Sequence, residues 1–76
     1  MSTEPRVPLR VTVNGAGTEL PADSSVADLV ARTFGSRSSD GVAVALNGAV
    51  VPRSRWAQTV VPAEAAVEIV TATQGG

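Results

Sequence analysis

The side chains of this chain offer few groups for catalysis. Its 76 residues include no His, Cys, Lys or Tyr, so Asp, Glu, Arg, Ser and Thr remain for proton transfer or nucleophilic attack. The seven acidic residues show no paired arrangement of the kind that hydrolases use. Without imidazole or thiolate ligands, and without the spacing of a calcium loop, a metal site is not expected either. We therefore predict no catalytic residue, no metal and no bound cofactor.

The C-terminal carboxylate is the reactive group that remains. The sequence ends in Gln74, Gly75 and Gly76. A terminal glycine pair is commonly a solvated chain end, because nothing penalises the disorder of Gly. The alternative is a reactive tail, because a backbone without side chains can enter a narrow channel of another enzyme. The glycine pair alone does not decide between these interpretations.

Acyl chemistry at Gly76 would require activation by another protein. An α-carboxylate is ionised at neutral pH and resists nucleophilic attack, and ATP overcomes this resistance by forming an acyl-adenylate. The glycine-containing segment at residues 14–17 lacks the Lys and the following helix of a phosphate-binding loop. A reactive tail would therefore make this chain a substrate and carrier rather than an enzyme.

Composition excludes several other classes of partner. Six Arg residues are balanced by seven acids, with a net charge of -1, one Trp and one Phe, so nucleic-acid binding by charge or stacking is not expected. No apolar run approaches the roughly 18 to 20 residues of a membrane span, and the first residues lack a signal-peptide pattern. We expect a cytoplasmic protein with no membrane partner. Arg as the only basic residue, with abundant Ala and Val, is typical of bacteria with G- and C-rich genomes.

The N-terminal third predicts a hairpin. Apolar residues alternate along a first strand, residues 7–13, which places Val7, Leu9, Val11 and Val13 on one face. Residues 14–17 tolerate positive φ and reverse the chain into a second strand, Thr18 to Pro21, with Leu20 pointing inward.

One main helix follows. Ser24 or Ser25 can cap it, and with Ser25 as the cap, Asp28 lies three residues later, where its carboxylate can accept from exposed N–H groups. The apolar residues after the cap recur at helical spacing, and Gly35 is the natural stop.

The second half predicts three further strands. Residues 36–41 indicate a surface loop, and the apolar run Val42 to Leu46 indicates a central strand buried on both faces. Asn47-Gly48 predicts a second hairpin, with a short strand that Pro52 ends. The remaining elements are the strand Ala49 to Val51, a brief turn at Arg53 to Ala57 that lays Trp56 against the domain, a connection at Ala63 to Ala66, and a last strand, Val67 to Ala72.

This order of elements matches the β-grasp arrangement of ubiquitin-like domains. We predict an α+β fold: a mixed sheet of four to five strands, with the first and last strands pairing at its centre and one main helix packed on one face. The predicted organisation is an N-terminal extension at residues 1–6, a single domain at 7–72 and a flexible tail at 73–76.

The sequence resembles the sulfur carrier family of thiamine biosynthesis, ThiS, over roughly residues 9–76. The resemblance is strongest from Val42 to Ala57, where an apolar strand, an Asn-Gly turn, Val-Val-Pro-Arg and Trp-Ala occur together. Similar segments are Val11-Thr12-Val13-Asn14-Gly15, Val26-Ala27-Asp28-Leu29, Val67-Glu68-Ile69-Val70-Thr71-Ala72 and the terminal Gln74-Gly75-Gly76. The segment Ala63-Glu64-Ala65-Ala66 departs from relatives, which often carry an acidic, glycine-containing turn there.

The resemblance implies a route for sulfur. A ThiF-like enzyme would adenylate Gly76 with ATP and magnesium, and a persulfide from a cysteine desulfurase would convert it to a thiocarboxylate. The thiocarboxylate would then donate sulfur to thiazole synthase, a ThiG-like protein. Gln74, Gly75 and Gly76 would form the segment threaded into these partner enzymes.

Several residues are candidates for a partner surface. Val70 faces away from Ile69 on its strand, and with Ala45 and Val44 it would form a small apolar patch. Such residues can equally be ordinary surface. Arg53 and Arg55 could contact an acidic partner or simply be solvated, whereas Trp56 is expected to be a packing residue.

Alternative functions remain open on the sequence. The small subunit of molybdopterin synthase is a carrier with the same fold and the same Gly-Gly chemistry, although the Val-Val-Pro-Arg to Trp-Ala segment favours the thiamine branch. A ubiquitin-like protein modifier would use the same activated glycine. A plain β-grasp binding module would leave the terminal glycines without a role.

Overall fold

The computed structural model describes residues 7–35 and 41–71. The predicted N-terminal extension, the tail and most of the predicted loop at 36–41 lie outside these ranges. The described elements, in chain order, are β1 (Leu9–Val13), β2 (Ala16–Leu20), α1 (Val26–Phe34), β3 (Val42–Leu46), β4 (Ala49–Val51), the 3₁₀ helix η1 (Arg53–Gln58) and β5 (Ala66–Thr71).

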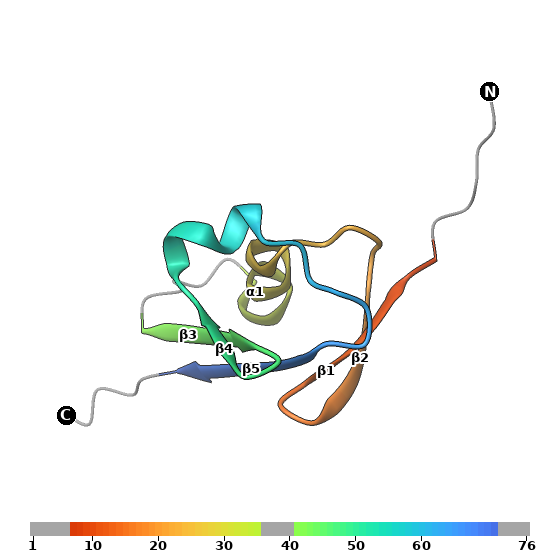
Figure 1. Cartoon of the computed structure of the whole chain (residues 1–76), viewed down its shortest axis with the longest axis horizontal. Helices are drawn as coiled ribbons and strands as arrows, with labels where there is room; N and C mark the ends of the chain where they lie inside the picture. Colours follow the sequence, from red (N-terminus) through yellow and green to blue (C-terminus); the bar gives the residue numbers. More distant parts are fainter. Residues whose placement is uncertain (1–6, 36–40, 72–76) are drawn as a thin grey trace.

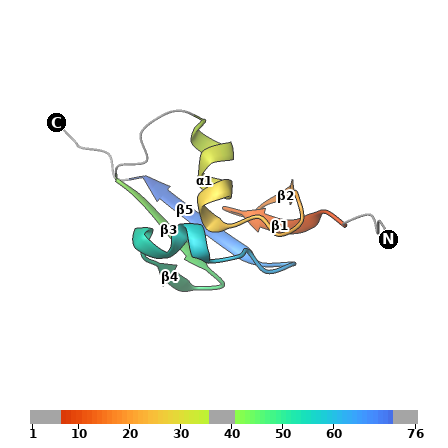
Figure 2. The same ribbon diagram turned by 90° about the horizontal axis from the view of Figure 1, so that it is seen from above.

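The strands form one mixed sheet with the order β2-β1-β5-β3-β4. The first and last strands pair in parallel at its centre, and the other neighbours are antiparallel. Helix α1 lies against one face, and β5 runs between the two hairpins (Figures 1 and 2). The predicted α+β fold, with its central pairing and single main helix, is confirmed.

The first hairpin is tighter than predicted. Its turn consists of Asn14 and Gly15 alone, with φ of 52° and 85°, so Ala16 and Gly17 belong to β2. Positive φ at both positions is the requirement of a type I′ turn, whose twist matches that of the flanking strands. The predicted start of β1 at Val7 is wrong: the strand begins at Leu9, and Val7 is 79% exposed.

Helix α1 begins and ends where the sequence predicted. The Ser25 hydroxyl accepts from the Asp28 N–H at 3.0 Å, and the Ser25 N–H donates to the Asp28 carboxylate at 2.9 Å. This reciprocal pair is a capping box, which satisfies two backbone N–H groups that the helix itself cannot. At the other end, the N–H of Gly35, at φ 66°, donates to the Ala31 carbonyl at 2.7 Å.

Strand β3 is not buried on both faces, which corrects the prediction for Val42 to Leu46. Val44 points into the core and is 1% exposed, whereas Ala43, on the opposite face, is exposed. The described residues supply a helical layer for one face of the sheet alone (Figure 1). The apolar run therefore alternates between the two faces of the sheet. Its larger side chains point into the core, and its alanines lie on the outer face.

The segment after β4 packs its aromatic residue into the core. Trp56 in η1 is 6% exposed, and its indole N–H donates to the Val51 carbonyl at 2.9 Å. The predicted packing role of Trp56 is thus confirmed. The core that α1, η1 and the inner sheet face enclose consists of Val11, Leu20, Val26, Leu29, Val30, Val44, Val51, Trp56, Val61, Ala65, Val67 and Ile69.

The turn before β5 is built without glycine. Glu64 adopts φ 64°, in the left-handed region, and its N–H donates to the Arg10 carbonyl at 2.7 Å. The strand then begins at Ala66, one residue before the predicted start. At Ala63 to Ala66, where the sequence departs from the family pattern, Glu64 thus occupies a conformation that Gly adopts more easily.

Candidate functional site

The outer face of the sheet, opposite α1, carries an apolar patch where β3, β4 and β5 meet. The register places Ala43 opposite Val70 and Ala45 opposite Val50, all on this face. Val50 and Val70 are 75% and 62% exposed. We call Ala43, Ala45, Val50 and Val70 the outer patch.

The outer patch is slightly hollow and has an acidic side chain at its edge. A cavity of about 220 Å³ is bounded by the four patch residues, by Val44 beneath them and by Glu68, which lies opposite Ala45 in the register. A shallow apolar surface with one charge at its rim is suited to a modest, exchangeable interface.

The structure brings together two of the predicted surface residues and separates the others. Ala45 and Val70 both lie in the outer patch, as the strand alternation indicated. Val44 belongs to the core instead. Arg53 and Arg55 lie on η1, which packs beside α1 on the inner side of the sheet (Figure 1). The Arg53 guanidinium carbon stands 5.1 Å from the centre of the Trp56 ring, a cation–π contact that covers the indole.

Sequence reasoning missed Ala43 and Val50 as patch residues. Both can be inferred once Ala45 is placed on the outer face. Ala43 shares that face because alternate residues of a strand do, and Val50 lies opposite Ala45 because the two-residue turn at Asn47-Gly48 fixes the register of β4. The predicted reactive residues, Gln74, Gly75 and Gly76, lie outside the described residues. The described residue closest to them in the sequence is Thr71, the last residue of β5.

The rest of the outer face is polar. Arg10 and Glu19 lie opposite each other on β1 and β2, and two further cavities, of about 300 and 340 Å³, adjoin Arg10. The first of these cavities is also lined by Thr12 and Glu64. The second also reaches Thr18, which lies opposite the core residue Val11 and so belongs to the inner face. The apolar half of the face therefore lies beside the end of β5, and the polar half lies on the first hairpin.

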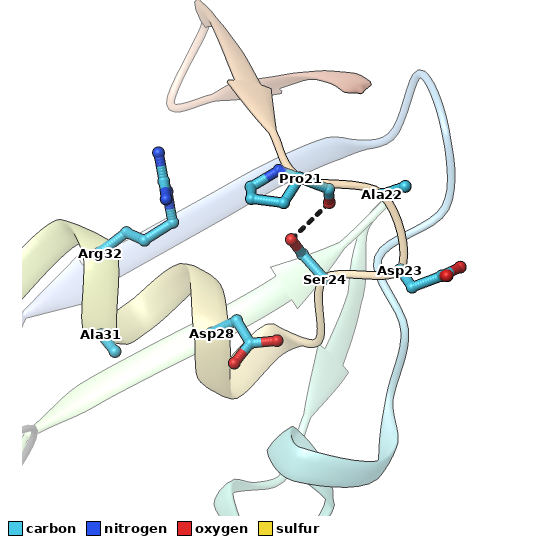
Figure 3. Close-up of a pocket in the computed structure, with 7 residues that line it drawn as sticks. All are labelled: Pro21, Ala22, Asp23, Ser24, Asp28, Ala31 and Arg32. Carbon is cyan, nitrogen blue, oxygen red and sulfur yellow. Dashed lines mark hydrogen bonds between the residues drawn. The ribbon is translucent and has the colours of Figure 1, made fainter. Parts of the chain in front are cut away.

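A cavity of about 340 Å³ beside the start of α1 is lined by acidic and basic side chains, and its Ser24 and Asp28 make local structural contacts (Figure 3). The Ser24 hydroxyl donates to the Pro21 carbonyl at 2.6 Å, and Asp28 belongs to the capping box. Asp23 occupies a left-handed turn with φ 66°. These contacts hold the connection between β2 and α1, and nothing in them selects a ligand.

The described part of the chain shows neither a metal centre nor a membrane helix. Within residues 7–35 and 41–71, no three Asp, Glu, His or Cys side chains come together as metal ligands. None of the helices in those ranges has the length and apolar character needed to cross a membrane.

The mixed sheet, the single main helix and the central parallel pair define a β-grasp protein. A comparison of folds finds a similar solved structure, the thiamine biosynthesis protein (ThiS) from Geobacter metallireducens. The two chains are 28% identical with a TM-score of 0.71, and the match covers 90% of this chain and 100% of the other. Among curated proteins, none matches this sequence significantly.

A sequence model of the ThiS family matches residues 10–76. The chain belongs to the ThiS family. The match includes the terminal glycine pair as well as all the described strands except the first residue of β1.

Proposed function

We propose that this protein is the sulfur carrier of thiamine biosynthesis and that sulfur travels on the carboxyl group of Gly76. The observation that carries this proposal is the family match, which runs to residue 76 and so includes Gly75 and Gly76. The similar fold of a thiamine biosynthesis protein supports it. A carrier also explains why the chain contains so few groups for catalysis.

The proposed chemistry has two stages. First, the Gly76 carboxylate attacks the α-phosphate of ATP on a ThiF-like enzyme, forming an acyl-adenylate and releasing pyrophosphate. Second, the terminal sulfur of a persulfide, supplied through a cysteine desulfurase, attacks the acyl carbon and AMP leaves. A thiol then reduces the resulting S–S bond, which leaves the thiocarboxylate on Gly76. Magnesium and ATP belong to the activating enzyme, and the carrier binds no cofactor.

The outer patch is the proposed docking surface. It lies beside the end of β5, and Val70 is both a patch residue and the penultimate residue of that strand. A partner that covers the patch is therefore held next to the point where residues 72–76 continue. Because the activating enzyme and thiazole synthase must both bind the carrier in turn, a small apolar surface is better suited to the role than a large permanent interface.

The tail residues have a steric role in this proposal. Gly75 and Gly76 present backbone without side chains, and Gln74 precedes them as part of the threaded segment. A channel that fits such a tail excludes bulkier chain ends. We place the reaction in the cytoplasm, where ATP is available.

Pyrophosphate exchange tests the first stage. With a ThiF-like enzyme, ATP, magnesium and labelled pyrophosphate, we expect label to enter ATP only when this protein is present, because reversal of adenylation requires the acyl-adenylate. A chain lacking Gly76 is the matched control and should give no exchange. Equal exchange with the shortened chain would contradict the role of Gly76.

The acceptor distinguishes this carrier from its nearest alternative. We expect the thiocarboxylated protein to support thiazole formation by a ThiG-like synthase. Sulfur transfer to a molybdopterin precursor, with no thiazole formed, would assign the protein to the other carrier class.

A further inference from the structure

Both Asn-Gly turns bind strand β5 as well as reversing the chain. At the second turn, the Asn47 N–H donates to the Ala66 carbonyl at 2.8 Å, and the Asn47 Oδ1 accepts from the Ala66 N–H, also at 2.8 Å. Asn47 thus closes the pairing between β3 and β5 at the first residue of β5.

Asn14 makes the corresponding contact near the other end of β5. Its Nδ2 donates to the Ile69 carbonyl at 3.1 Å, and its Oδ1 accepts from the Ile69 N–H at 2.9 Å. These two hydrogen bonds reproduce what a peptide group of a neighbouring strand would make. At Asn14 the backbone leaves the extended conformation, with φ 52°, and β1 ends. The Asn14 side chain therefore supplies the hydrogen bonds to β5 that the next residue of a longer β1 would have made.

The position of this contact determines how far β5 is paired on both sides. On the β1 side, the backbone pairing runs from Ala66 to Val67, where the Asn14 N–H donates to the Val67 carbonyl at 2.8 Å. The Asn14 side chain extends it to Ile69. On the β3 side, pairing continues to Thr71. Among the described residues, Ile69 is therefore the last residue of β5 that is hydrogen-bonded to the first hairpin.

We propose that Asn14 is a positioning residue that fixes where the C-terminal tail leaves the sheet. This inference rests on the proposed carrier function. Residues 72–76 can extend at most about 18 Å beyond Thr71. If the end of β5 stays on the sheet, the point from which that length is measured, Thr71, stays next to the patch residue Val70. If Ile69 loses its contact with Asn14, β3 still pairs with Val70 and the outer patch persists, but the direction in which the chain leaves Thr71 is less fixed, and a docked carrier no longer presents its carboxylate at a fixed place.

The turn alone does not require an amide at position 14. Gly or Asp also tolerates the positive φ of a type I′ turn, but Asn combines a donor and an acceptor in one planar group. Asn14→Gly therefore keeps the turn and removes the contact with Ile69. Asn47→Gly is a matched control, because it makes the same change at the equivalent turn and affects β5 at Ala66, five residues before Thr71.

Amide hydrogen exchange and the kinetics of activation test the proposal together. In Asn14→Gly we expect the Ile69 amide to exchange about tenfold faster or more, and in Asn47→Gly the Ala66 amide instead. With the activating enzyme, Asn14→Gly should lower kcat roughly tenfold with KM nearly unchanged, because the outer patch still docks while the carboxylate is misplaced. Asn47→Gly should stay within about twofold of wild type.

Asn14→Asp provides a second variant. Asp keeps the acceptor for the Ile69 N–H but places a carboxylate oxygen, instead of a donor, against the Ile69 carbonyl, so its kcat should also fall below that of wild type. If the wild-type protein is activated and the two glycine variants have the same kcat, the inference is overturned and the carrier function stands. If the wild-type protein is not activated by a competent enzyme, the carrier function fails, and the inference fails with it.

Discussion

Glu64 occupies a left-handed turn position that a residue with a side chain disfavours. At φ 64° an L-residue with a Cβ is less stable than Gly, typically by about 1–2 kcal/mol, while Gly loses more backbone entropy on folding. The Glu64 N–H nevertheless reaches the Arg10 carbonyl, which ties the turn to β1. The balance of these effects can be measured directly.

We expect Glu64→Gly to raise the free energy of unfolding by up to about 1 kcal/mol, because the relief of the left-handed backbone exceeds the added entropy of the unfolded chain. Ala63→Gly is the control. Ala63 is not at positive φ, so its replacement should lower stability by about 0.5–1 kcal/mol. Urea denaturation followed by circular dichroism measures both. A loss of stability in Glu64→Gly would show that backbone strain at this turn is negligible.

The terminal glycines define a second prediction at the residue scale. Gly75→Val should abolish activation, because a branched side chain does not fit a channel that admits bare backbone. Circular dichroism and the thermal midpoint should match those of wild type, since position 75 lies beyond the last strand. Gln74→Ala, which shortens a side chain at the neighbouring position, is the control and should keep most of the activity. Normal adenylation of Gly75→Val would refute the steric role.

The elements are short, so their ends contribute strongly to stability. Helix α1 has nine residues, fewer than the roughly 12–15 needed for an isolated helix to be even marginally stable in water. Its stability depends on packing of Val26, Leu29 and Val30 and on the capping box at Ser25 and Asp28. The helix in turn covers the sheet face opposite the outer patch.

Ser25→Ala should lower the free energy of unfolding by about 1 kcal/mol, because the Asp28 N–H loses its acceptor at the start of α1. Ser54→Ala makes the same chemical change at an exposed position of η1 and should alter stability by less than about 0.5 kcal/mol. Chemical denaturation of the two variants in parallel gives the difference. Equal effects would mean that the cap does not stabilise the fold.

Local signals predicted most of the elements, because hairpin turns and helix caps depend on residues close in sequence. Asn47-Gly48 and the Ser25 cap are examples. Burial of β3 was predicted wrongly, because whether a second layer covers a sheet is not a local property. The Ile69 contact of Asn14 spans 55 positions of sequence, and a turn pattern contains no information about it. The tail was predicted from its glycine residues and from the family resemblance, and in the proposed function its chemistry is carried out by partner enzymes.

At the scale of the whole molecule, the two sheet faces have different roles. The inner face and α1 enclose the core, and the outer face presents the apolar patch beside the end of β5 and polar side chains on the first hairpin. This separation allows a partner to bind the outer face without disturbing the core.

Val70→Lys tests the outer patch. A charge at this exposed position should raise KM for the activating enzyme roughly tenfold with little change in kcat or in the thermal midpoint. Val60→Lys is the control, because Val60 is 56% exposed and pairs with Ser25 at the start of α1, away from the patch. If both variants shift KM equally, docking does not depend on the outer patch.

The carrier function is tested most directly by intact mass spectrometry of the protein after incubation with ATP, magnesium, a ThiF-like enzyme, a persulfide sulfur donor and a thiol reductant. The account predicts a mass gain equal to the replacement of one oxygen by one sulfur, localised by fragmentation to Gly76. An unchanged mass, with an activating enzyme shown to be active on another carrier, would contradict it.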